Sequence, residues 1–120
     1  SYTKQTMVAY MSEEDLNRLC AYIVEYSSGD TLQKVSPVKV DSQLKSIDIM
    51  HFGWNIGKAF GRKRIHTATL IKNVFAHTLR DLEISTIERK MSHTESGCKI
   101  RLNPNFLIFL VPFISFEFES

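Results

Sequence analysis

The sequence is poor in cysteine and proline and contains no long apolar run. Its two cysteines, Cys20 and Cys98, form no CxxC pair, so no small disulfide framework is expected. The longest apolar run, over residues 106–114 with Pro112 inside it, is shorter than the roughly 20 residues that span a membrane. The first residues also lack the pattern of a signal peptide. We therefore expect a cytoplasmic protein without membrane segments.

The motifs of common catalytic and cofactor sites are missing as well. There is no GxxxxGK[ST] or GxGxxG stretch, so no loop that cradles phosphates is predicted. The four histidines have no HxxxH spacing, so neither a metal nor another cofactor is expected. A small metal-dependent nuclease stays open as a less favoured alternative. Its carboxylates and lysine would be Asp81, Glu83, Glu88 and Lys90.

The charge of the chain is unevenly distributed, although the net charge is only +2. Residues 1–60 carry six Lys/Arg against seven Asp/Glu, and residues 61–105 carry nine against four, a local excess of +5. Residues 106–120 carry two glutamates and no basic residue. A basic segment of this kind indicates a polyanionic partner, although a merely solvated surface accounts for it equally well.

The order of the elements predicts a single α+β domain over residues 1–120, with about four helices and a C-terminal antiparallel sheet. A helical scaffold is expected over residues 12–60, a helix-turn-helix-like pair over 67–93 and a β-hairpin over 98–119. A short strand ending near Met11 can add to that sheet.

Cap residues and apolar spacing indicate the two scaffold helices. Ser12 is expected to cap the first, and Asp15 occupies the capping-box position three residues later. The second is expected to begin near Asp41 or Ser46. Glycines one turn apart on that helix favour close packing by another helix over a ligand site. The apolar face of the second helix comprises Ile49, Phe52, Gly53, Ile56 and Phe60, with Gly57 as the other glycine and Gly61 just past its end.

Two shorter helices are expected in the basic segment. Thr67 can cap the first, which would run to Leu79 and end in a turn. Ser85 and Glu88 match a capping box for the second, over about 86–93.

The C-terminal part of the chain has the patterns of strands. Residues 98–102 and 113–119 alternate between polar and apolar, and 106–111 are typical of a buried strand. Five phenylalanines lie between Phe106 and Phe118. If such strands were exposed at an edge, they would pair with another chain. The alternative function is therefore a homo- or hetero-oligomeric protein-interaction module, with a homodimer formed through these strands.

Over residues 41–111 the chain resembles winged helix-turn-helix domains in the order of its elements and in the charge around its helices. The basic link of residues 61–66 precedes the two helices, and the strands follow them. The resemblance implies that the helix over 86–93 enters the major groove, where Arg89 can hold the edge of a guanine. The residues expected to contact nucleic acid are Arg62, Lys63, Arg64, Lys72, Thr86, Arg89, Lys90, His93, Lys99 and Arg101.

We therefore predict a non-catalytic nucleic-acid-binding domain with double-stranded DNA as its partner. Its role would be that of a regulator or of an accessory to a mobile element or to replication. The discriminating feature is geometric. Convergence of the cationic side chains on one surface favours this function, whereas scattered cations and an exposed apolar patch over 106–118 favour the interaction module.

Overall fold

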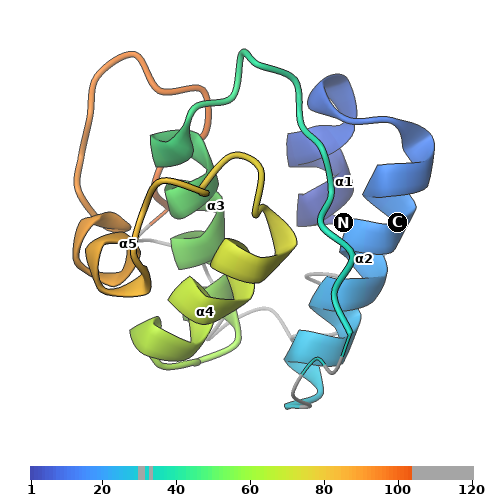
Figure 1. The fold of residues 1–120 in the computed structure, drawn as a ribbon, viewed down its shortest axis with the longest axis horizontal. Coiled ribbons are helices and arrows are strands. Elements are labelled where there is room, and N and C mark those ends of the chain that lie inside the picture. Colours follow the sequence, from blue (N-terminus) through green and yellow to red (C-terminus); the bar gives the residue numbers. More distant parts are fainter. Residues whose placement is uncertain (30–31, 33, 104–120) are drawn as a thin grey trace.

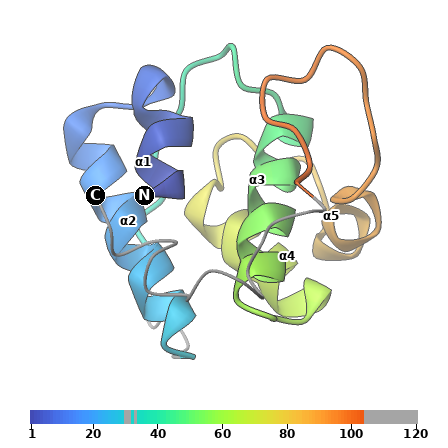
Figure 2. The same cartoon turned by 180° about the vertical axis from the view of Figure 1, so that it is seen from behind.

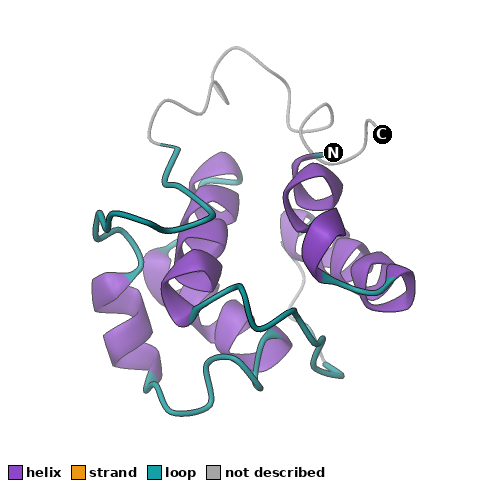
Figure 3. Cartoon of the chain, turned by 90° about the horizontal axis from the view of Figure 1, so that it is seen from above, coloured by secondary structure: helices purple, strands orange, loops and turns teal. Residues whose placement is uncertain are grey.

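The computed structural model describes residues 1–29, 32 and 34–103 (Figure 1). Helices within the described residues are α1 (Tyr2–Met7), the 3-10 helix η1 (Val8–Tyr10), α2 (Glu13–Ser27), α3 (Ser46–Ala59), α4 (Arg64–Val74) and α5 (Ile84–Lys90). Seen from above, α1 and α2 lie on one side of the molecule and α3, α4 and α5 on the other (Figure 3).

The segment 34–45 joins the two groups of helices. The Lys39 N–H donates to Asp15 Oδ2 of α2 at 2.9 Å, and the neighbouring Val38 N–H donates to the Val74 carbonyl of α4 at 2.9 Å. Val38 is also fully buried in a hydrophobic cluster that takes residues from α1 to α5. An irregular segment therefore fixes the position of α2 relative to α4.

The predicted α+β fold is wrong for the described part of the chain, which contains helices and no β-strand. Residues 98–102 return along α3 as an irregular segment (Figure 2). Side chains of α3 take the place of a strand partner, since Asp48 Oδ1 accepts from the N–H groups of Lys99 and Ile100 at 2.6 and 3.0 Å. Residues 98–103 therefore do not form the strand that would begin the expected wing, and the winged-helix-like architecture is corrected for the described residues. The remaining strand residues, 106–119, lie outside the described part.

The strand predicted near Met11 is wrong as well, because the chain begins with a helix. Ser1 caps α1 by accepting from the Lys4 N–H at 3.3 Å. Thr3 and Met7, one turn apart on α1, are both fully buried. A polar cap and two buried residues at helical spacing explain why this segment folds as a helix.

The prediction for α2 is confirmed at its N-terminus. Ser12 Oγ accepts from the Asp15 N–H at 3.1 Å, and three acidic residues occupy the first turn. Leu16, Leu19 and Ile23 are buried at helical spacing. The helix ends at Ser27, and Gly29 follows with a positive φ of 87°.

The close packing predicted for the α3 glycines is confirmed, and α4 is the helix that packs there. A Cβ on Gly53 would lie 2.8 Å from side-chain carbons of Ile71, and a Cβ on Gly57 would collide with Thr67 Oγ1. The glycines therefore allow α4 to approach closer than any larger residue would permit. Ten of the 14 residues of α3 are buried, which makes it the central helix.

The boundaries of α4 and α5 differ from the prediction. Thr67 does not cap α4, which begins at Arg64; instead Thr67 is buried and its hydroxyl lies 2.6 Å from the Tyr26 hydroxyl. The capping box predicted for α5 is also wrong, since that helix begins at Ile84 with Glu83 before it and without a side-chain cap. The link between the helices, residues 75–83, is nine residues long. A helix-turn-helix has a turn of only three or four residues, so the pair does not have that geometry.

Candidate nucleic-acid interface

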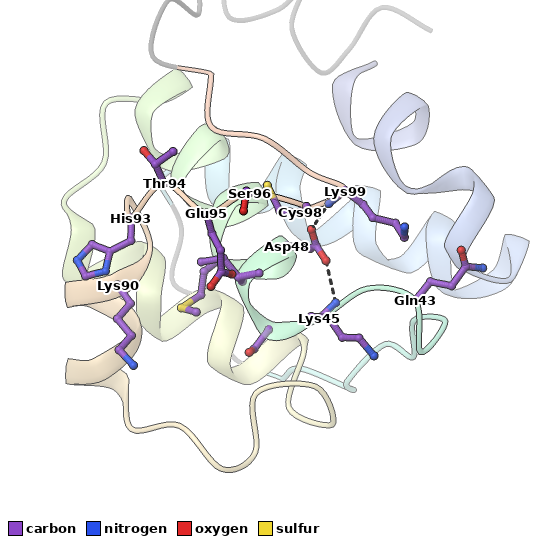
Figure 4. A pocket seen from close by; sticks show the side chains of 14 residues that line it. Gln43, Lys45, Asp48, Lys90, His93, Thr94, Glu95, Ser96, Cys98 and Lys99 are labelled. Carbon is purple, nitrogen blue, oxygen red and sulfur yellow. Dashed lines mark hydrogen bonds between the residues drawn. The ribbon is translucent and has the colours of Figure 1, made fainter.

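A groove of about 750 Å³ lies between the beginning of α3 and the segment that comes after α5. Its lysines come from three places: Lys45 from the residue before α3, Lys90 from the end of α5, and Lys99 from the returning segment. Figure 4 shows these side chains around the groove, with His93 beside Lys90. The groove therefore gathers cations that are far apart in the sequence.

The charges in this groove are mostly positive. Glu95 is its exposed carboxylate, whereas Asp48 is 1% exposed. Asp48 accepts from three backbone N–H groups: Lys45 at Oδ2, and Lys99 and Ile100 at Oδ1. A carboxylate satisfied in this way has little capacity left to neutralise the lysines. Three lysines therefore line a groove that has one available carboxylate.

A polar face of α3, formed by Asp48, His51 and Asn55, holds the returning segment that forms one wall of the groove. The ring nitrogens of His51 lie 2.7 Å from the Ile100 carbonyl and 2.7 Å from the His93 carbonyl. Asn55 Nδ2 donates to the Arg101 carbonyl at 2.9 Å, and Asn55 Oδ1 accepts from the Asn103 N–H at 2.8 Å. All three side chains are about 1% exposed. The position of Lys99 is thus set by buried hydrogen bonds.

Of the ten residues predicted to contact nucleic acid, Lys90, His93 and Lys99 line this groove. All three are exposed. No hydrogen bond or ion pair occupies the ammonium group of Lys90 or Lys99 within the described residues, whereas Lys45 Nζ donates to the Ser42 carbonyl at 3.0 Å. At least two of the three lysines are therefore free to bind an anion.

Arg62 is half-buried and bonded to other parts of the protein instead. Its Nη2 donates to the carbonyls of Tyr26 and Ser27 at 3.1 and 3.2 Å, in the last turn of α2. The guanidinium carbon also lies 5.7 Å from the centre of the Tyr26 ring. These contacts give the last-turn carbonyls of α2 a charged donor, and they argue against a phosphate contact. Burial of Tyr26 raises the pKa of its phenol. The hydrogen bond to Thr67 and the charge of Arg62 lower this pKa, but by less.

Two further predicted cations are also occupied by backbone carbonyls. Arg64 donates to the Ser92 hydroxyl at 2.9 Å and to the Glu88 carbonyl, at the end of α5. Lys72 Nζ donates to the carbonyls of Leu79 and Arg80 at 2.8 and 3.1 Å. Both side chains connect α4 to later segments of the chain, so the predicted cations do not all converge on one surface.

The other four predicted residues do not line this groove. Lys63 precedes α4 and is exposed, and Thr86 is half-buried in α5. Arg89 is exposed in the last turn of α5, next to Lys90. Arg101 lines a second hollow, of about 690 Å³, which it shares with His51 and Trp54. Contacts of these residues with nucleic acid stay predictions.

The sequence reasoning missed Lys45 and the polar face of α3. Lys45 occurs in an ordinary stretch of the scaffold, and no spacing relates it to Lys99, which comes 54 positions later. A signal did exist for the face, since Asp48, His51 and Asn55 recur at helical spacing opposite the apolar stripe. Polar residues at such spacing on an otherwise apolar helix indicate a buried partner.

Other kinds of site receive little support in the described ranges. There, no group of three or more His, Cys, Asp or Glu residues lies close enough together to hold a metal ion. None of the helices described is both long and apolar enough to cross a bilayer. The chain matches no protein-family model, and neither a curated protein nor a solved structure matches it.

Proposed function

We propose that this chain binds nucleic acid without catalysis, through the groove lined by Lys45, Lys90 and Lys99. The observation that carries the proposal is the gathering of these lysines, from three separate places in the chain, around a hollow with one available carboxylate. Eight of its 14 lining residues come from the basic segment 61–105, in which an excess of positive charge indicates a polyanionic partner.

Lysine ammonium groups are suited to phosphates but carry no sequence information. The proposed contact is therefore with the sugar-phosphate backbone, and double-stranded DNA is the proposed ligand. Arg89 is exposed one residue before Lys90, which leaves it free to reach a base edge next to the bound backbone. A role as a regulator or as an accessory to a mobile element or to replication is part of the proposal.

The proposal is tested by the salt dependence of binding. A fluorescently labelled duplex of random sequence is titrated with the protein at several salt concentrations, and anisotropy gives the Kd. The triple variant Lys45→Ala, Lys90→Ala, Lys99→Ala is expected to bind more weakly. In this variant the plot of the logarithm of the association constant against the logarithm of the salt concentration should be less steep, by about two to three, since each phosphate contact contributes about 0.9 to the steepness.

The matched control removes the same charge from another part of the surface. Lys4, Lys34 and Lys39 are exposed and lie outside the groove, so their triple alanine variant should retain the slope. Equal weakening in both variants would show that total charge and not the groove attracts DNA. If the unmodified protein does not bind the duplex even at low salt, the proposal is wrong. A single-stranded oligonucleotide in a parallel titration shows whether the duplex is preferred.

A further inference from the structure

His51 makes an unusual pair of contacts for a buried histidine. Its side chain is 1% exposed, Nδ1 lies 2.7 Å from the Ile100 carbonyl oxygen, and Nε2 lies 2.7 Å from the His93 carbonyl oxygen. A carbonyl oxygen can only accept a hydrogen bond. Both ring nitrogens must therefore donate if both contacts are hydrogen bonds.

A neutral imidazole carries one N–H group, whereas the imidazolium carries two. With a neutral ring, one ring nitrogen has no hydrogen, and its lone pair would face a carbonyl oxygen across 2.7 Å. Neither this nitrogen nor this oxygen would then have a donor. Leaving a buried acceptor unpaired costs about 1–3 kcal/mol. A doubly protonated ring satisfies both contacts, whereas a neutral ring satisfies one of them.

Some of the charged groups around His51 favour a positively charged ring, and others oppose it. Asp48 lies one turn earlier on the same face of α3, where its carboxylate favours a positive ring. Glu95, Cys98 and Arg101 line the hollow next to the ring. The remaining charged or titratable groups nearby are Arg64, bonded to Ser92 at the edge of that hollow, and Lys90, His93 and Lys99 of the groove. The cations among them repel a charged ring.

We propose that His51 is a proton-dependent positioning residue of the groove. With both nitrogens protonated it holds the returning segment at His93 and at Ile100, the two ends of the stretch that carries the groove wall. Loss of one proton releases the His93 end, because the Ile100 end is also held by Asp48. The wall that presents His93 and faces Lys90 then loosens while Lys99 stays anchored.

The proton is thereby linked to the proposed function, on which this part of the inference rests. A bound phosphate backbone offsets the repulsion that Lys90, His93 and Lys99 exert on the ring, so binding favours the protonated form. By reciprocity, protonation of His51 favours binding. Affinity should therefore fall as the pH rises, by at most about tenfold per pH unit for one proton.

Nuclear magnetic resonance of the unmodified, ¹⁵N-labelled protein tests the proton itself, without nucleic acid. Spectra from about pH 5 to about pH 9 cover the range in which histidine ordinarily titrates. We expect both ring nitrogens of His51 to carry protons at the acidic end, and one proton to be lost together with shifts at the His93 backbone. A singly protonated ring throughout, in a folded protein, would overturn the inference whether or not DNA binds.

The binding consequence is measured in a His93→Gln background, which removes the one histidine that lines the groove among the described residues. Adding His51→Gln leaves a side chain that can donate but cannot titrate, and the remaining pH dependence of Kd should disappear. His77→Gln, in an exposed turn outside the groove, serves as the control and should retain it. If the pH dependence persists in His51→Gln, the linkage is wrong. Absence of binding at every pH would contradict the proposed function and leave the resonance result to decide on His51.

Discussion

The cationic residues of the basic segment 61–105 fall into two groups: some bond to the backbone of the protein, and others remain available to a ligand. Arg62, Arg64 and Lys72 donate to backbone carbonyls of α2, of α5 and of the turn after α4. Carbonyls at helix ends need such donors, and a cation near the C-terminal end also interacts favourably with the helix dipole. The charge of a segment, counted from its sequence, therefore overstates the charge available to a ligand. Lys90 and Lys99 belong to the smaller set that remains available.

Tyr26 supplies a prediction at the same scale. Burial raises the pKa of its phenol above the ordinary value of 10.0. The folded protein thus retains the proton more tightly than the unfolded chain, so stability is unaffected below about pH 10 and falls as the pH rises above it. Tyr26→Phe should show a smaller alkaline loss of stability. It should also be less stable by about 1 kcal/mol at neutral pH, because the Thr67 hydroxyl loses a partner.

Urea unfolding at about pH 7 and about pH 10.5 measures both effects. Tyr10→Phe is the control, since the Tyr10 side chain is only half-buried and lies at the end of η1, away from Thr67 and Arg62. An alkaline loss that is equal in Tyr26→Phe and in the unmodified protein would show that other groups cause it.

At the scale of elements, the contact between α3 and α4 depends on the absence of a side chain at Gly53 and Gly57. Gly57→Ala should destabilise the protein by about 1–2 kcal/mol, because the collision with Thr67 Oγ1 outweighs the roughly 1 kcal/mol that alanine contributes to a helix. In a Thr67→Ala background, most of the obstructing atoms are gone, and Gly57→Ala should be nearly neutral. Denaturant unfolding of the four proteins in this cycle gives the coupling. Additive effects would show that α4 does not constrain Gly57.

The elements also show which patterns were informative. Ser12 and the apolar spacing predicted α2, and the two glycines of α3 predicted a close helix neighbour. The alternation over residues 98–102 was misleading, since it predicted a strand. That alternation reflects an irregular segment that bends at Lys99 and Ile100 and buries Ile100, and the partners of its backbone are side chains of a helix. A polar-apolar alternation indicates which side of a segment is buried. It does not indicate which groups form hydrogen bonds with the backbone N–H and C=O groups of that segment.

At the scale of the whole molecule, the asymmetry of charge along the chain could be read from composition, but the groove could not. Its formation depends on bringing Lys45 to within reach of Lys99, which the bonds from Asp48 to both backbones achieve. A single buried carboxylate thus joins two walls of the groove. Such a contact between distant positions leaves no local pattern in one sequence. Of the cations expected to converge, Lys90 and Lys99 line the groove together with Lys45, whereas Arg62, Arg64 and Lys72 are bonded elsewhere in the protein.

The position of the groove predicts where nucleic acid should protect the backbone. Hydrogen exchange, followed by mass spectrometry with and without a saturating duplex, should slow in peptides that cover residues 43–48 and 90–100, which line the groove. Peptides of α1 and α2 should change little, because those helices lie on the other side of the molecule (Figure 3). Bound phosphates restrain both walls and reduce the local opening that permits exchange. The triple lysine variant should lose this pattern at the same duplex concentration. Protection centred on α2 would place the interface on the opposite side and contradict the groove.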